Sequence, residues 1–542
     1  MASTHDSAIL SPAPMSRFPI EILTEIFLAL TIEAFLEPHS NFEVPELPSR
    51  VPSQVCSEWR RVLLNYPPYW TKIVLGGFSQ KEWFDELAKR SKGRPLDVRV
   101  YSDPYHPTHV RREQPVTNLD HAMHRISQIR SLEVYANFSE LQVAFVRLRH
   151  PVKAPFLESL VVEKYPYSMS PARMEDMEIS RQELRKLPKK AGRISAPLLR
   201  HLKSHCYSRV LLLGPFRGLR KVEITDTRYL EILTHNELLE SLSGLPELEE
   251  LICKAELSGP ENSSGEHVSL PRLKHLTLWT SAEPFHIVLS AIEAHPSCIF
   301  NFHISQLLLC EDHDCINIGR AIGEKTKKWA DIQLVSGTIV DIQLKDPNVL
   351  YVYPNPRTEQ SSFLRLSLGR EEYLRWDPIH HCPYQISDIL QSIIRNVGTP
   401  TKVRICRNGW NLGPPMLGLL NTLGSVTDLS LHDIKGDMMS CLSIPGIFPN
   451  LEVLRISGDT TEEALQVETP RGVELQRLVD TLKERKRSPC RLALIDLAGL
   501  DPSNPLYLDT MESATGLEKL GLKLDFADKV SRGTANVWNN TL

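Results

Sequence analysis

Cysteine and histidine side chains gather in one short stretch of the chain and could bind a metal there. Cys310, His313 and Cys315 lie within six residues of one another, and His381 and Cys382 could add further ligands. Thiolate and imidazole groups are the usual ligands of zinc, but structural zinc sites normally draw on two separate, regularly spaced ligand pairs. The acidic residues between these ligands also suit a solvated loop. The sequence therefore predicts no metal, and a metal-dependent enzyme stays as the weaker alternative.

The chain contains none of the short motifs that mark common catalytic sites. It has no G-x-S-x-G nucleophile turn, no G-x-x-x-x-G-K-[ST] phosphate loop, no H-E-x-x-H zinc motif and no dinucleotide-binding glycine pattern. We therefore expect a protein that is not an enzyme, needs no cofactor and works by binding.

Length, composition and charge restrict the classes of partner. The 542 residues exceed one ordinary hydrophobic core, so we expect several domains or one elongated stack of repeats. Hydrophobic residues make up 42% and charged residues 24%, as in ordinary folded proteins. The net charge is −4, from 62 basic and 66 acidic residues, so no overall field draws the chain to nucleic acid or anionic lipid. The sequence predicts neither a nucleic-acid nor a membrane partner.

No segment has the features of a secretory leader or of a membrane-spanning helix. The first residues lack a basic start followed by an apolar core, and no apolar run approaches the roughly 18 to 20 residues that span a bilayer. Residues 1–16 are predicted to be a disordered leader. The ten cysteines are scattered along the chain, which suits a reducing compartment. The expected location is the cytoplasm or the nucleus.

Residues 17–75 carry two apolar stripes with helical spacing. Pro19 suits the first turn of a helix, because its missing N–H costs nothing there. The first stripe consists of Ile22, Leu23, Ile26, Phe27 and Leu30. Residues 31–50 contain three prolines and are expected to form a loop. The second stripe ends before Pro67 and consists of Val55, Cys56, Trp59, Val62 and Leu63.

This two-part pattern resembles the F-box, and most closely the F-box-like families of fungi. The residues that carry the resemblance are Phe18, Pro19, Leu23, Ile26, Phe27, Val55, Cys56, Trp59, Arg60 and Trp70. The chain departs from the family pattern at residues 47–52, which read Leu-Pro-Ser-Arg-Val-Pro where family members tend to carry a leucine run. The resemblance covers about a tenth of the chain.

The resemblance implies docking to the adaptor subunit of a cullin-RING ubiquitin ligase, while the rest of the chain selects the protein to be ubiquitinated. Carried over position by position, the adaptor-facing residues are Phe18, Pro19, Ile22, Leu23, Ile26, Val55, Cys56, Trp59 and Trp70. A module this small cannot bury both stripes internally, so apolar surface is left for a partner helix. The alternative for each residue is a place in the module's own core.

A short apolar motif recurs along the rest of the chain. It consists of leucine, two variable residues, an apolar residue, one variable residue and a further apolar residue, often after a proline. Copies begin at Pro155, Gly218, Pro246, Pro271, Ser425, Pro449 and Gly516, and weaker copies read WADIQL and TIVDIQL within residues 310–362. The first leucines of adjacent copies lie 29 residues apart from Leu219 to Leu248, and 25 from Leu248 to Leu273. These spacings fall in the range of leucine-rich repeats.

The predicted fold class is α/β: a small N-terminal all-α F-box-like module followed by a leucine-rich-repeat-like solenoid. Each copy predicts one short strand, and helical spacing between copies predicts parallel strands with right-handed crossovers. The predicted domains are the F-box-like module at 17–75, a connecting segment at 76–125, the repeats at 126–525 and a tail at 526–542. A non-repeat α/β assembly is the alternative.

The sequence thus predicts a substrate-recognition adaptor of an SCF-type ubiquitin ligase. The alternative is a repeat scaffold whose N-terminal helices merely cap the first repeat. Strand-face positions between the repeat leucines would contact the unknown target protein, and the candidates are Arg272, Lys274, Thr277, Glu452 and Arg455.

Overall fold

The computed structural model of the 542-residue chain describes the segments that position the candidate sites. The described residues are 18–36, 51–75, 81–101, 116–136, 152–164, 194–205, 216–225, 233–258, 267–295, 297–305, 312–333, 341–346, 349–353, 364–368, 389, 391–393, 402–406, 414–432, 442, 444, 446–457, 494–499 and 523–525. Contacts divide the chain into two compact units. Unit 1 comprises residues 1–233 and 240–248, and unit 2 comprises residues 234–239 and 249–542.

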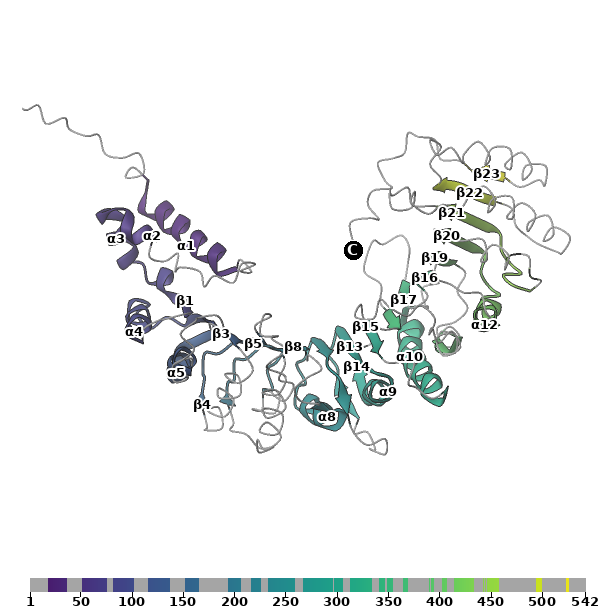
Figure 1. The fold of residues 1–542 in the computed structure, drawn as a ribbon, viewed down its shortest axis with the longest axis horizontal. Coiled ribbons are helices and arrows are strands. Elements are labelled where there is room, and N and C mark those ends of the chain that lie inside the picture. Colours follow the sequence, from purple (N-terminus) through teal and green to yellow (C-terminus); the bar gives the residue numbers. More distant parts are fainter. Residues whose placement is uncertain are drawn as a thin grey trace, which may run out of the picture. The chain divides into compact units, whose positions relative to one another are not determined.

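Helices open unit 1 and then alternate with its first strands (Figure 1). They are α1 (Ile20–Leu36), α2 (Val51–Val55), α3 (Ser57–Leu64), the 3-10 helix η2 (Pro67–Thr71), α4 (Lys81–Arg90), α5 (Val116–His124) and the 3-10 helix η3 (Ile126–Gln128). The loop expected from residue 31 is wrong at its start, because no proline interrupts the chain before Pro38 and α1 continues to Leu36. The second predicted helix is divided at Cys56, whose backbone is extended.

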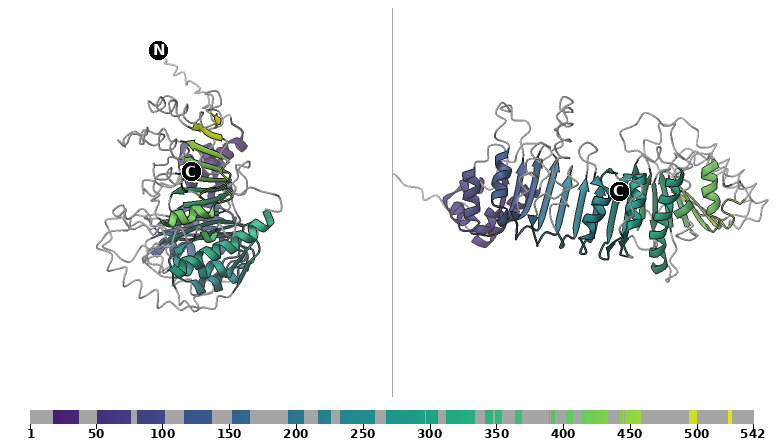
Figure 2. Two further views of the ribbon diagram at one scale, coloured as in Figure 1. Left: turned by 90° about the vertical axis from the view of Figure 1, so that its right-hand side faces the viewer. Right: turned by 90° about the horizontal axis from the view of Figure 1, so that it is seen from below.

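Unit 1 contains a parallel sheet in which β1, β2, β3, β5, β7 and β8 pair in that order. The strands of the unit are β1 (Lys72–Leu75), β2 (Leu96–Tyr101), β3 (Ile129–Ala136), β4 (Val152–Lys153), β5 (Ser159–Lys164), β6 (Ile194–Ser195), β7 (His201–His205) and β8 (Lys221–Thr225). They run side by side in the blue part of the chain (Figure 2). The segment 76–125, expected to connect two domains, supplies α4, α5 and β2, and β2 pairs with both β1 and β3.

One face of this sheet forms the core of unit 1. Its apolar residues are in register across neighbouring strands and buried: Val98, Leu132, Leu160, Leu202 and Val222. Helix α4 contacts β1, and α5 contacts α4 and β2. Because successive side chains of a strand point to opposite faces, the residues between these apolar positions form a second, polar face.

Unit 2 contains a sheet that is parallel at both ends. The strands β10, β13, β15 and β18 pair in parallel, as do β16, β19, β20, β21, β22 and β23, and the antiparallel strand β17 joins β18 to β16. These strands are β10 (Glu250–Lys254), β13 (His275–Ser281), β15 (Ile299–Ser305), β16 (Asp341–Asp346), β17 (Val349–Tyr353), β18 (Leu364–Leu368), β19 (Lys402–Cys406), β20 (Asp428–His432), β21 (Val453–Ser457), β22 (Leu494–Gly499) and β23 (Lys523–Asp525).

The remaining elements are short strands and helices. They are β9 (Leu233–Thr234), α8 (His235–Ser243), β11 (Leu257–Ser258), β12 (Val268–Leu270), α9 (Ala282–Ala291), β14 (Ile292–Ala294), α10 (Asp312–Gln333) and α12 (Pro414–Thr422). Strands β12 and β14 pair in parallel, and α9 packs against α10. The main chain N–H of Thr234 donates to the Glu237 carboxylate and its hydroxyl accepts from the Glu237 N–H, a reciprocal pair that fixes the start of α8.

Six copies of the repeat motif lie at strands that the structure describes, namely β5, β8, β10, β13, β20 and β21. Other strands, such as β3, β7, β15 and β19, were not among the predicted copies. In the copy at Pro271, Leu273 fills a turn and Leu276 and Leu278 point into the core from β13; all three are buried. WADIQL is wrong as a strand, because residues 329–333 continue α10, whereas TIVDIQL supplies β16. The copy at Gly516 lies outside the described residues. The fold class is therefore α/β with a large, mainly parallel sheet.

Candidate docking surface on the N-terminal helices

Exposed apolar side chains are concentrated in the helices that open unit 1. Of the eleven large hydrophobic side chains that are exposed within the described residues, seven lie before residue 65: Phe18, Ile20, Ile22, Ile26, Leu30, Val55 and Leu64. Exposed apolar groups that gather on one small module mark a surface suited to a partner, whereas single ones are ordinary.

Helix α1 separates its apolar residues into two rows. Leu23, Phe27 and Thr31 recur every four residues and are buried. Ile22, Ile26 and Leu30 recur with the same spacing, one residue earlier, and are exposed. The difference is large at neighbouring positions, since Leu23 keeps 2% of its surface exposed and Ile22 keeps 46%. One row therefore anchors the helix while the adjacent row faces outward.

The buried row is held by a chain of aromatic contacts. Phe27 meets the Trp59 ring edge to face, with 4.9 Å between centroids, and meets the Tyr69 ring at 6.4 Å. Tyr69 and Trp70 are perpendicular at 5.0 Å, and the guanidinium of Arg90 lies 4.7 Å from the Trp70 ring centre. Burial raises the pKa of Tyr69. The Trp70 indole N–H donates to the Leu63 carbonyl at 2.7 Å, so its polar atom is satisfied inside the core.

Cys56 fixes the joint between α2 and α3. Its Sγ accepts a hydrogen bond from the Trp59 N–H at 3.4 Å, which places it at the N-cap of α3. The Arg60 side chain donates from Nε to the Ser53 carbonyl at 3.0 Å and so ties α3 back to α2. The Asn65 side chain donates to the Arg61 carbonyl at the other end of α3. Two short helices are thereby held at a defined joint, with Val55 and Cys56 exposed beside it.

The residues predicted to face an adaptor fall into three groups. Phe18, Pro19, Ile22, Ile26, Val55 and Cys56 are exposed. Trp59 is partly buried against Phe27, and Leu23 and Trp70 belong to the core. Trp59 and Trp70 are linked through Phe27 and Tyr69.

Three exposed apolar residues were missed by the sequence reading of the surface: Ile20, Leu30 and Leu64. Leu30 belonged to the predicted stripe, and the four-residue spacing from Ile22 and Ile26 could have assigned it to the outward row. No sequence signal separates Leu64 from the buried Leu63 beside it.

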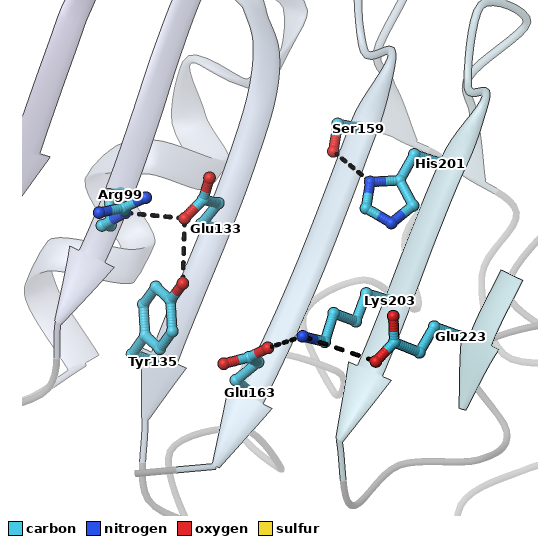
Figure 3. Close-up of polar contacts among 8 residues, drawn as sticks. All are labelled: Arg99, Glu133, Tyr135, Ser159, Glu163, His201, Lys203 and Glu223. Atoms are coloured by element: carbon cyan, nitrogen blue, oxygen red, sulfur yellow. Dashed lines mark hydrogen bonds and ion pairs between the residues drawn. The ribbon is translucent and has the colours of Figure 1, made fainter. Parts of the chain in front are cut away.

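The polar face of the unit 1 sheet carries a second, contrasting arrangement (Figure 3). Arg99 donates from Nε to Glu133 at 2.7 Å, and the Tyr135 hydroxyl donates to the same carboxylate at 3.1 Å. The Tyr101 and Tyr135 rings stack at 5.0 Å. Burial and the nearby Glu133 raise the pKa of Tyr135, and burial raises that of Tyr101.

Further along the same face, other polar side chains also contact one another. Lys203 lies between Glu163, at 2.5 Å, and Glu223, at 3.6 Å (Figure 3). Despite desolvation, hydrogen bonding to Glu163 raises the pKa of Lys203. Ser159 and His201 Nδ1 are 3.2 Å apart. Opposite charges on this face therefore neutralise one another through ion pairs.

The positions predicted to contact a target lie in unit 2. Thr277 lies in β13, partly buried, and Arg455 lies in β21, where it pairs with Asp428 at 3.2 Å. Arg272, Lys274 and Glu452 are exposed but precede their strands, so their assignment to the strand face is wrong: each strand begins two residues after the first repeat leucine. Lys274 pairs with Glu249 at 2.9 Å.

The cysteine and histidine cluster is only partly within the described residues. Cys315 is buried in α10, and His313 lies in the same helix, while Cys310, His381 and Cys382 fall outside the described part of the chain. Within that part, no group of three or more potential ligands is placed to hold a metal ion.

Comparisons with known proteins yield no assignment. No protein-family model matches the chain, and no curated protein is significantly similar to it in sequence. Among the helices that the structure describes, none is long and apolar enough to cross a membrane.

Proposed function

We propose that this chain is a docking adaptor that binds a helical partner through the exposed apolar residues of α1 and α2. The partner we propose is the adaptor subunit of a cullin-RING ubiquitin ligase, as the resemblance of residues 18–70 to an F-box implies. The rest of the chain would form a leucine-rich-repeat-like domain that holds the protein to be ubiquitinated. The mechanism is proximity: the chain itself makes and breaks no bond, and it raises the local concentration of target near the ligase.

One observation carries this proposal: the outward row of Ile22, Ile26 and Leu30 on α1. An apolar row spaced by four residues is the surface that a second amphipathic helix fills. The row is exposed although its neighbours Leu23 and Phe27 are fully buried, so its residues are not needed for the module's own core.

The test uses the full chain and the purified adaptor subunit. Ile22→Asp combined with Ile26→Asp is expected to weaken adaptor binding at least about a hundredfold, because two central apolar contacts are replaced by charge. Ile316→Asp is the matched control, since Ile316 also lies on a helix, α10, and is 47% exposed against 46% for Ile22. Wild-type protein that is folded yet shows no affinity for the adaptor would sink the proposal.

Cys56 offers an independent footprint of the same surface. Its thiol is exposed beside Val55, whereas burial raises the pKa of Cys298 to about 12. We expect an alkylating reagent to modify Cys56 readily, because its thiol is exposed, and Cys298 hardly at all, because burial keeps its thiol protonated and the thiolate is the reactive form. Bound adaptor should slow the modification of Cys56 without changing Cys298, as peptide mass analysis would show. Equal rates with and without adaptor would contradict the placement of the surface.

The scaffold alternative has one observation in its favour. Helix α1 contacts β1 and η2 through its buried row, as a cap on the first strand of the sheet would. If the double aspartate variant keeps its stability and neither it nor the wild type binds the adaptor, the capping role alone remains.

A further inference from the structure

The turns of unit 1 that precede β5, β7 and β8 have the same construction. Residues 154–157, 196–199 and 216–219 each close with a main chain hydrogen bond from the fourth residue to the first, at 3.2, 3.1 and 2.9 Å. In each turn the first and last residues are buried. The middle pairs face outward, and they are Pro155 and Phe156, Pro197 and Leu198, and Arg217 and Gly218.

The three turns stack on one another at the edge where the strands begin. The Arg200 N–H donates to the Glu158 carbonyl and the Arg220 N–H to the Arg200 carbonyl, both at 2.8 Å. Strands β4 and β6 pair just before the first two turns. Since neighbouring parallel strands lie about 4.8 Å apart, the outward pairs form one continuous row. We call residues 154–157, 196–199 and 216–219 together the turn ridge.

Two large apolar side chains occupy equivalent positions on the turn ridge. Phe156 and Leu198 are separated by 42 residues, the same offset that relates Ser159 to its strand partner His201. Phe156 is 47% exposed and Leu198 is 41% exposed. At the third turn the equivalent residue is Gly218. The apolar pair therefore lies at one end of the ridge and the glycine at the other.

Basic side chains surround this apolar pair. Residues 152–158, 194–200 and 216–220, all described by the structure, contain four basic residues and one acidic residue, so their net charge is +3. They are Lys153, Arg200, Arg217 and Arg220, with Glu158, and all five are exposed.

Gly218 positions one of the arginines. Arg200 donates from Nη1 to the Gly218 carbonyl at 2.7 Å. A Cβ at position 218 would lie 1.9 Å from that same nitrogen, so a side chain there would displace the guanidinium. The glycine thus keeps Arg200 lying along the ridge.

We infer that the turn ridge is a docking surface for an acidic peptide segment that carries large apolar side chains. Phe156 and Leu198 would contact the apolar side chains, and Lys153, Arg200 and Arg217 would pair with the flanking carboxylates. The peptide is favoured over nucleic acid, because affinity for a phosphate backbone comes mainly from cations that neutralise phosphates, and this ridge offers only four cations, arranged around an apolar centre. Glu158 also opposes a uniformly anionic surface, whereas a peptide can place an uncharged residue beside it.

This inference is independent of the proposed adaptor function, because the turn ridge shares no residue with the exposed face of α1 and α2. The probe is a fluorescent synthetic peptide in which glutamates flank a pair of leucines, titrated with the full-length protein at low and at moderate salt. A matched peptide with lysines in place of the glutamates reports on charge, and one with serines in place of the leucines reports on the apolar contact.

Binding is expected only for the peptide with glutamates and leucines, and more weakly as salt increases. Phe156→Ser combined with Leu198→Ser should lower its affinity at least about tenfold. Arg217→Glu should lower it to a similar extent, while Arg320→Glu, an exposed arginine of α10, should leave it unchanged. Gly218→Ala should weaken binding with no change in melting temperature, because only the Arg200 guanidinium has to move.

Several results would overturn the inference. One is wild-type protein that binds the lysine peptide as well as the glutamate peptide. Another is affinity that the ridge variants do not alter while circular dichroism shows them folded. Tighter association with a DNA duplex or with anionic lipid vesicles, lost in the same variants, would assign the ridge to those ligands instead.

Discussion

The N-terminal helices and the polar sheet face of unit 1 differ in which side chains they leave without a contact inside the unit. The helices leave apolar residues such as Ile22 and Val55 exposed although a buried row lies beside them. The sheet face places opposite charges close together: Arg99 pairs with Glu133, and Lys203 pairs with Glu163 and Glu223. The helices thus leave apolar side chains exposed to solvent, whereas the charged side chains of the sheet face are already paired.

This difference indicates which surface gains more from a partner. Covering an exposed apolar row contributes free energy directly, in proportion to the area removed from water. A partner on the polar sheet face has to replace ion pairs that already exist, and a desolvated pair repays that loss only with good geometry. We therefore expect a partner to gain affinity from the helices rather than from the sheet face.

The largest effect on the free energy of unfolding is expected at a fully buried residue beside the helices, Trp70. Trp70→Ala should lower the free energy of unfolding of unit 1 by about 3–5 kcal/mol, because it removes a fully buried indole together with the hydrogen bond from its N–H to the Leu63 carbonyl. Chemical denaturation followed by circular dichroism measures the change. A loss below about 1 kcal/mol would mean that the aromatic chain does not hold the helices.

The next largest effect tests whether the Arg99–Glu133 ion pair stabilises the polar face of the sheet. Arg99→Ala should cost about 3 kcal/mol, because the side chain of Glu133, 18% exposed against 8% for Arg99, would lose its cation. Tyr135 would still donate to it. Arg99→Met combined with Glu133→Leu should recover most of the stability, since neither charge then remains. If the single and double variants are equally unstable, packing rather than charge pairing dominates this face.

A smaller effect is expected in both regions at alkaline pH. Tyr69 in the helices and Tyr135 on the sheet both have a raised pKa, by burial and, for Tyr135, also by Glu133. A raised folded pKa stabilises fully below the unfolded value of about 10, and this stabilisation is lost as the pH rises through the folded value. Unfolding free energies should therefore fall above about pH 10.

Two variants assign that alkaline loss. Tyr135→Phe and Tyr69→Phe should each flatten the dependence, and denaturation at a series of pH values with phenolate absorbance records it. An unchanged slope in both variants would mean that other groups cause the alkaline loss.

The smallest effect concerns the outward row of α1. Ile26→Gln should change the free energy of unfolding by about 0.5 kcal/mol or less, because the side chain is exposed and glutamine is a good helix former. Leu23→Gln, in the adjacent buried row, is the matched comparison and should cost several times more. Similar losses in both would erase the distinction between an anchoring row and a docking row.

The sequence predicted strands better than it predicted the boundaries around them. Repeat leucines such as Leu248, Leu273 and Leu451 marked turns and strands correctly, because a buried parallel strand requires apolar residues at fixed positions. The strand at 329–334 was wrong, since short apolar runs fit a buried helix equally well. The antiparallel strand β17 has no counterpart in the repeat pattern.

The candidate site was predictable in position but not in detail. Helical spacing located the two stripes, yet spacing alone cannot tell which of two adjacent rows, Leu23 or Ile22, meets the rest of the unit. That choice depends on Trp59 and Tyr69, which reach Phe27 only in the folded unit. The equivalent positions of Phe156 and Leu198 in neighbouring turns likewise follow from strand register, which a separation of 42 residues in the sequence does not reveal.

The main chain hydrogen bonds at the start of β7 and β8, from Arg200 to Glu158 and from Arg220 to Arg200, align these strands whatever the length of the chain between them. His201 follows its partner Ser159 by 42 residues, whereas Lys221 follows His201 by only 20, and yet the register of the ladder is the same. The path between neighbouring strands can therefore lengthen without disturbing the edge where the strands begin. We therefore expect the protein to tolerate foreign segments inserted at residues 165–193, because the register of the strands does not depend on the length of this connection.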